Sequence, residues 1–376
     1  MWLLQGRELP LDLSELQGRK FVCVDQCQLC CLCQPELLSS EVPFFKNHFP
    51  ERLVVRRTPH KHTALALKKG GGPCTFLEGG RCSVYPNRPH YCRQFPFHVY
   101  LGERVQVELD LSCRGVWMDQ GDDATLLGLR LVEENRSTIA RGLQDSSEIY
   151  EQFRTNCQDA ELELEPQRLR ADLEAKMEHL ADPFYLGRML EMSVEDEEMS
   201  LPAAFQVDEN SGEELRQAAM ETSLESLNSM DPFSSPVYCD PQGRWNIFMS
   251  QDGELDLYVM GEEGDLERAQ GIDPRKVPLL RPEGEGKKLF LDYLRMLNRR
   301  DSMLGHAYYL LDDLGYEDHL PNVYYGSIAT AAVDLLWRSS LLAHVTGEGL
   351  RYDGVREGII YYDMDRLDAP TIGAFI

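Results

Sequence analysis

The sequence predicts an α+β protein in which a small, loop-rich cysteine-cluster domain precedes a helical segment and a C-terminal unit of strands and helices. Three observations predict this class. Nine of the 11 cysteines lie between Cys23 and Cys113 among glycines and prolines, leucines at helical spacing follow, and strand-like runs come after them. The chain has 376 residues, and single cores seldom exceed about 250 residues, so we expect two or three domains.

The first predicted domain covers residues 1–120 and differs from the rest of the chain in charge. It carries 15 Lys and Arg against 12 Asp and Glu, whereas the remainder carries 23 against 51. A net charge of -25 repels phosphate backbones, so we expect no nucleic-acid partner. A protein partner or a protein substrate is the expected class, and the sequence gives no oligomeric state.

The start of the chain predicts its compartment. It has no basic leader, and no uncharged apolar stretch of about 18 residues occurs, so we expect neither export nor a membrane span. The expected location is the cytoplasm. Clustered cysteines in a reducing compartment favour metal binding over disulfides.

Leucine spacing predicts a helical segment over residues 121–192. Residues 193–230 are acidic and poor in aromatic side chains, which indicates an acidic linker or an exposed helix. The last predicted domain, residues 231–376, is an α+β unit that opens with a β-meander. The expected strands are Val237–Cys239, Trp245–Met249 and Glu254–Met260, with a hairpin turn at Asp252-Gly253.

Two long helices should complete the C-terminal unit. One is expected from Lys287 to Leu314, and the other from Ser327, as N-cap, to a glycine stop at Gly347. Asp334 and Arg338 should pair on the second helix. The Asp363-Met-Asp365 pair is expected on the solvated surface.

The chemistry of the chain is concentrated in Cys23-Val-Asp-Gln-Cys27-Gln-Leu-Cys30-Cys31-Leu-Cys33, which holds five thiols in eleven residues. Thiolates are soft anionic ligands for zinc and iron, and short turns let two sulfurs converge on one metal. Consecutive side chains diverge, by about 100° on a helix. The Cys30-Cys31 pair therefore favours two metal centres or a polynuclear cluster over one mononuclear site.

A second block, Cys74-Thr-Phe-Leu with Cys82, Arg88-Pro, Cys92-Arg-Gln-Phe-Pro and the later Cys113-Arg-Gly, makes the pattern specific. It resembles the CxxCxxCC, or YkgJ-like, family of zinc- or iron-chelating domains over about residues 20 to 117. The resemblance implies that an iron–sulfur cluster, 4Fe-4S before other types, or zinc is bound. Eight cysteines match the cysteine pattern of this family and are the ligands that the resemblance implies for the cofactor or metal. These framework cysteines are Cys23, Cys27, Cys30, Cys31, Cys74, Cys82, Cys92 and Cys113.

Other residues near this frame are also assigned from the sequence. Cys33 is an additional cysteine, and Gln28 stands where the family often has glycine. Arg88 and Arg93 are expected to offset thiolate charge or to brace loops. Cys157 and Cys239 stand apart and are expected to be buried apolar residues.

Three functional classes remain open on the sequence. The first is a binding module folded around zinc. The second is an iron–sulfur protein that modifies other proteins, because the cysteine pattern is distantly similar to that of flagellin lysine N-methylase. The third is a radical S-adenosylmethionine enzyme, because Cys23, Cys27 and Cys30 have its ligand spacing. Leu29 and the acidic helical stretch that follows disfavour this class, and the sequence does not decide whether the protein is an enzyme.

Overall fold

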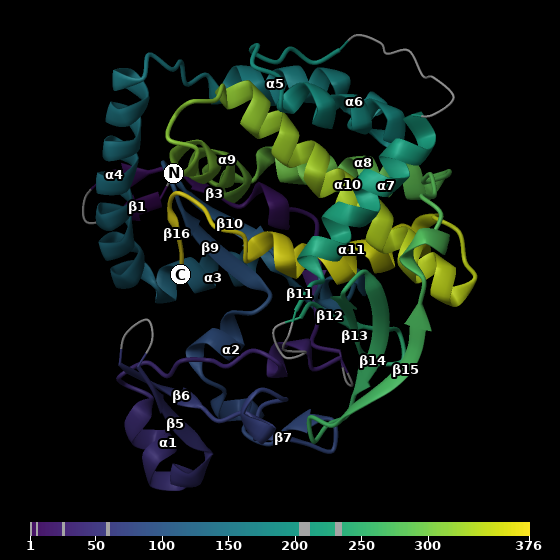
Figure 1. Cartoon of the computed structure of the whole chain (residues 1–376). Helices are drawn as coiled ribbons and strands as arrows, with labels where there is room; N and C mark the ends of the chain where they lie inside the picture. Colours follow the sequence, from purple (N-terminus) through teal and green to yellow (C-terminus); the bar gives the residue numbers. More distant parts are fainter. Residues whose placement is uncertain (1, 5–6, 25–26, 58–60, 203–210, 230–234) are drawn as a thin grey trace.

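The computed structural model describes residues 2–4, 7–24, 27–57, 61–202, 211–229 and 235–376 (Figure 1). Short N-terminal strands are followed by central helices, then by a four-stranded antiparallel sheet and further helices. The predicted α+β class is therefore confirmed. No helix among the described residues is both long enough and apolar enough to cross a membrane.

Short strands and two short helices make up the cysteine-rich region. The helices are α1 (Val42–His48) and α2 (His90–Gln94). The strands are β1 (Trp2–Leu4), β2 (Arg7–Leu9), β3 (Leu11–Asp12), β4 (Lys20–Phe21), β5 (Leu53–Arg56), β6 (His62–Leu65), β7 (Leu77–Glu78), β8 (Arg81–Cys82), β9 (Phe97–Leu101), β10 (Val105–Leu109) and β11 (Asp122–Asp123). The last strand of the chain, β16 (Ala374–Phe375), pairs antiparallel with β9. The two ends of the sequence therefore share one sheet, in the order β16-β9-β10-β3.

The helices expected over residues 121–192 are present. They are α3 (Ala124–Glu134), α4 (Arg136–Asp159), α5 (Pro166–Lys176) and α6 (Pro183–Ser193). A further helix, α7 (Ser211–Ser226), lies within the segment expected to be an acidic linker or an exposed helix, and it packs on α10 (Leu320–Thr346). Because α10 is apolar on all sides, it is buried on all sides and forms the centre of the main core.

The β-meander has the order β12-β13-β14-β15, and all its pairs are antiparallel. Its strands are β12 (Val237–Cys239), β13 (Trp245–Gln251), β14 (Glu254–Met260) and β15 (Leu266–Ile272). The hairpin expected at Asp252-Gly253 is confirmed, and both residues have positive φ values, 51° and 78°. The edge strand β15 was not predicted, because its residues are mostly exposed and show no apolar alternation.

The helix expected from Lys287 to Leu314 is two helices, α8 (Glu285–Arg299) and α9 (Asp301–Asp313). The break is at Arg300, whose ψ of 127° is extended. The buried Arg300 guanidinium donates to Glu15 Oε1 at 2.8 Å and to Asp363 Oδ1 at 2.8 Å. These contacts hold Arg300 in the extended conformation that separates α8 from α9. A local sequence pattern does not reveal them.

Three further expectations for the C-terminal unit have mixed outcomes. Helix α10 does stop at Gly347, which has φ 77°, but Ser327 is not its N-cap because its hydroxyl donates to Val323 O inside the helix. The Arg338–Asp334 pair is confirmed, with Nε and Oδ1 2.9 Å apart. The expectation of a solvated Asp363 was wrong: this residue of α11 (Tyr352–Leu367) is fully buried, because it is the counter-ion of Arg300.

Candidate metal centre

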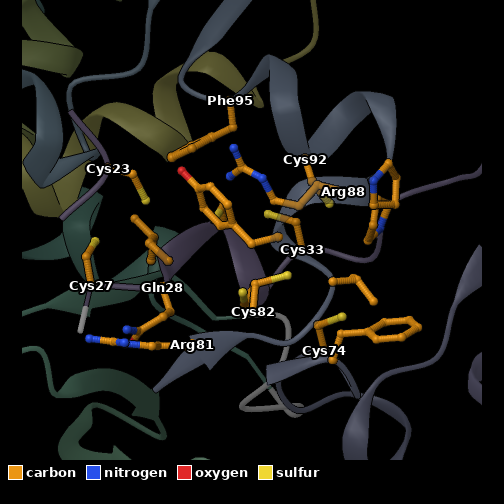
Figure 2. A pocket seen from close by; sticks show the side chains of 18 of the residues that line it. Cys23, Cys27, Gln28, Cys33, Cys74, Arg81, Cys82, Arg88, Cys92 and Phe95 are labelled. Carbon is orange, nitrogen blue, oxygen red and sulfur yellow. The ribbon is translucent and has the colours of Figure 1, made fainter. Parts of the chain in front are cut away.

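Nine cysteines line one cavity of about 360 Å³. Eight of them are the predicted ligands, Cys23, Cys27, Cys30, Cys31, Cys74, Cys82, Cys92 and Cys113, and the ninth is Cys33. Figure 2 shows Cys27 on one side of the cavity and Cys74 on the opposite side. Among the residues that the structure describes, no three His, Cys, Asp or Glu side chains converge closely enough to hold one metal ion. The sulfurs are thus distributed around the cavity wall.

The first cysteine segment turns sharply at Gln28. This residue has φ 44°, in the left-handed region that favours glycine, which accounts for the family preference at this position. A single 3-10 turn, Leu29–Cys31, follows, and the Cys31 N–H donates to Gln28 O at 2.8 Å. Leu29 is buried and anchors the turn. Through this turn Cys30 and Cys31 both line the cavity although they are adjacent in sequence.

The second cysteine segment is joined to the first through the backbone. The Cys74 N–H donates to Cys31 O at 2.7 Å, and Cys82 lies on β8, which pairs with β7. Cys92 is carried by α2, and Cys113 follows β10. Four separate stretches of the chain therefore meet at the cavity.

The core beside this cavity is small. Its buried members are Leu37, Phe45, Leu65, Cys74, Phe76 and Val84, and Cys31 and Cys82 pack against them. A core of this size contributes little stability, and small domains of this kind usually need disulfides or metal ions. All 11 cysteines are free thiols. The donor set and the small core both fit a metal that thiolates prefer.

The thiols at the cavity differ in acidity. The neighbouring Cys239 thiol is the main reason that the pKa of Cys27 is lowered. Burial raises the pKa of Cys74 to about 11 and raises the pKa of Cys113 well above its usual value. These buried thiols are protonated at neutral pH, so binding a metal through them must release protons.

Two arginines expected near the thiolates take different positions. Arg88 lines the cavity, its guanidinium carbon lies 4.0 Å from the centroid of the Tyr85 ring, and its buried Nε has no hydrogen-bond partner among the described residues (Figure 2). Arg93 lies on α2 and donates from Nη1 to Arg88 O. Arg88 is therefore placed to offset thiolate charge, and Arg93 braces its backbone.

The two cysteines outside the cavity are both buried, as expected, but only one of them stands apart from it. Cys157 lies on α4 in the main core. Cys239 on β12 packs against Cys27 in a second cluster of buried residues, and its Sγ donates to Cys27 O at 3.4 Å. Sequence analysis missed this contact because the two residues are 212 positions apart and no local pattern links them.

Comparison with known proteins supports the metal assignment at the level of the domain. Residues 22–114 match the model of the CxxCxxCC family, described as a "Putative zinc- or iron-chelating domain". The matched segment contains all nine cysteines of the cavity. No curated protein and no solved structure matches the chain, so the distant likeness to flagellin lysine N-methylase has no support there. The chain thus contains a metal-binding cysteine-cluster domain, with zinc or iron as the candidate metals.

Proposed function

We propose that this protein binds iron–sulfur, as 4Fe-4S before other cluster types, through sets drawn from the eight framework cysteines. The observation that carries the proposal is that these eight thiols, contributed by four stretches of the chain, line one cavity. Iron–sulfur clusters of the common types take four cysteine thiolates each, so eight thiolates make up two sets. Cys33 is left over from this count.

The Cys30-Cys31 turn favours a polynuclear centre over a single ion. In a tetrahedral zinc site with Zn–S bonds of about 2.3 Å, the four sulfurs lie close together around one point. Here two adjacent side chains both line a cavity of about 360 Å³ whose wall carries Cys27 and Cys74 on opposite sides (Figure 2). A centre with several metal ions reaches such dispersed sulfurs more easily than one ion does.

The protein's own side chains supply the environment of the centre. When bound, an iron–sulfur cluster supplies one-electron redox chemistry. Arg88 provides a positive charge at the cavity wall, and Phe21, Phe76 and Phe95 keep much of that wall apolar. Positive charge and apolar surroundings tune a cluster's reduction potential in opposite directions. A redox or structural role with a protein partner is the function that this environment supports.

Zinc is the second candidate metal, and the small core next to Cys74 favours it. A closed four-thiolate zinc site has no open position for a substrate, and it contributes directly to the free energy of folding. In that case the domain is a folded module for docking a protein partner. Both assignments use the same cysteines, and they differ in whether these thiols bind zinc or an iron–sulfur cluster.

Anaerobic purification of the full chain, expressed in iron-replete medium, tests the proposal. We expect brown protein that contains iron and acid-labile sulfide and absorbs in the visible range. Colourless protein with stoichiometric zinc would replace the iron–sulfur assignment with the zinc assignment. Protein that binds neither metal, even after anaerobic reconstitution, would overturn metal binding altogether.

A further inference from the structure

The β-meander contacts the backbone of one predicted ligand directly. The indole Nε1 of Trp245, on β13, donates to Cys27 O at 3.0 Å, and the Cys239 thiol, on β12, donates to the same oxygen at 3.4 Å. A carbonyl oxygen has two lone pairs, so these two donors occupy the acceptor capacity of Cys27. Both donor residues are more than 200 positions away from Cys27 in the sequence.

The same part of the meander also contacts the residue that follows a second predicted ligand, Cys113. Arg114 follows Cys113, and its guanidinium donates to Cys239 O from Nε at 2.8 Å and from Nη2 at 2.6 Å. Arg114 also forms an ion pair with Glu357 on α11, which in turn accepts a hydrogen bond from Tyr238 OH at 2.8 Å. Residue Cys239 thus connects to Cys27 through its thiol and to the Cys113 loop through its carbonyl.

The turn that follows β14 is also attached to the cysteine region, and it lies at the same end of the meander because Met260 pairs with Trp245. The turn after β14 places the Glu262 carboxylate on the N–H groups of Gly79 and Gly80, at 2.7 and 2.9 Å. These glycines form the turn between β7 and β8, just before Cys82. Lys68 Nζ lies 2.8 Å from Glu263 Oε1 in the same contact. The end of the meander that carries Cys239 and Trp245 is therefore attached to the cysteine region through several contacts.

We propose that Trp245 and Cys239 are positioning residues of the metal centre, which hold the Cys27 ligand in place and make metal affinity depend on the β-meander. This inference rests on the proposed function, because it requires that Cys27 binds metal. A ligand whose backbone is already fixed loses less conformational freedom when it binds. Changes to hydrogen-bond partners of metal ligands typically cost about 10- to 100-fold in metal affinity.

A purely structural role for Trp245 makes a different prediction. Trp245 is buried with Ile247 and Met260, so its removal must also cost packing free energy. Trp337 offers a matched control, because it is buried in the main core and its Nε1 has no hydrogen-bond partner among the described residues. If packing alone matters, Trp245→Phe and Trp337→Phe should affect metal binding equally.

The test measures Co²⁺ affinity of the full chain by anaerobic chelator competition, with the thiolate-to-cobalt charge-transfer band as a second readout. We expect Trp245→Phe to weaken Co²⁺ binding by about 10- to 100-fold and to shift the band. Trp337→Phe should leave both unchanged, whatever it does to thermal stability. Equal affinities and identical bands for the two variants would overturn the inference.

Substitutions of Cys239 keep the test decisive if Trp245→Phe does not fold. Cys239→Ser retains a donor and should bind Co²⁺ within a few-fold of the unmodified protein, whereas Cys239→Val removes the donor at similar size and should bind more weakly. Cys157→Val is the matched control for a buried thiol far from the cavity. Equal binding by Cys239→Ser and Cys239→Val would contradict the positioning role. Failure of the unmodified chain to bind any metal would instead contradict the proposed function.

Discussion

Replacing Cys74 with serine should remove metal and loosen the small core together. A structural zinc site of four ligands contributes about 10–16 kcal/mol, or about 2.5–4 kcal/mol for each thiolate. At about 1.4 kcal/mol for each factor of ten, losing one ligand should weaken metal binding by about 60- to 700-fold. Cys74 belongs to a core with only five other buried members, so its amide and those of its neighbours should also lose protection from hydrogen exchange.

Cys157→Ser is the control for this variant. Cys157 is fully buried in the main core, so an unpartnered hydroxyl there should cost about 1–3 kcal/mol of stability without altering metal content. Chelator competition gives the affinities, and hydrogen exchange over residues 63–83 reports on the small core. If Cys74→Ser kept full metal content and full protection, Cys74 would not be a ligand. Equal metal loss in both variants would show that general destabilisation, not ligation, causes the effect.

Three further variants test the fold and the cavity wall. Arg300→Leu leaves three buried carboxylates, those of Glu15, Glu108 and Asp363, without their cation. It should lower the free energy of unfolding by about 3–5 kcal/mol in urea titrations, whereas a loss below about 1 kcal/mol would refute the paired-charge account. Burial lowers the pKa of His306 from 6.5 to about 4. As the pH drops from 6.5 towards 4, the imidazole is therefore protonated in the unfolded chain before it is protonated in the folded protein, and the free energy of unfolding should fall. His306→Gln should flatten the dependence of this free energy on pH over that range, and an unchanged pH profile would argue against a role of His306. In Gly115→Ala the new Cβ would lie 2.2 Å from Val22 O at the cavity wall, so metal content should fall, while Gly349→Ala, which meets no atom within 4 Å, should bind metal normally.

The parts of the fold that the sequence predicted are those set by local patterns. Period-two alternation and an Asp-Gly turn located β12 to β14, and leucine spacing located the helices from α3 to α6. The break at Arg300 was not predictable, because its cause is a pair of carboxylates from distant parts of the chain. Asp363 was misassigned for the same reason, since a charged residue is buried only when a partner is supplied by the tertiary structure.

In the candidate site, too, the sequence predicted the features that depend on local patterns and not those that depend on tertiary contacts. Short cysteine spacings and the family resemblance identified eight lining residues, and the structure adds Cys33 to the wall. The hydrogen bonds from Trp245 and Cys239 to Cys27 are not encoded in any local motif, because they link strands of the meander to a loop 212 and 218 positions away. The predicted division of the chain into residues 1–120, 121–192, 193–230 and 231–376 stays a prediction. The pairing of β16 with β9 places the last strand of the chain in one sheet with strands of the first predicted domain.

X-ray absorption at the iron and zinc edges of the anaerobically purified full chain tests the central claim most directly. The account predicts a first shell of sulfur ligands only, at about 2.3 Å for either metal, with iron as the main metal and a second shell of neighbouring iron atoms. Cysteine-to-serine substitution at Cys82 should change that shell, whereas Cys157→Ser should leave it unaltered. A shell dominated by nitrogen or oxygen, or a metal whose shell is unaffected by substitution of the cavity cysteines, would contradict the claim that these thiols hold the metal.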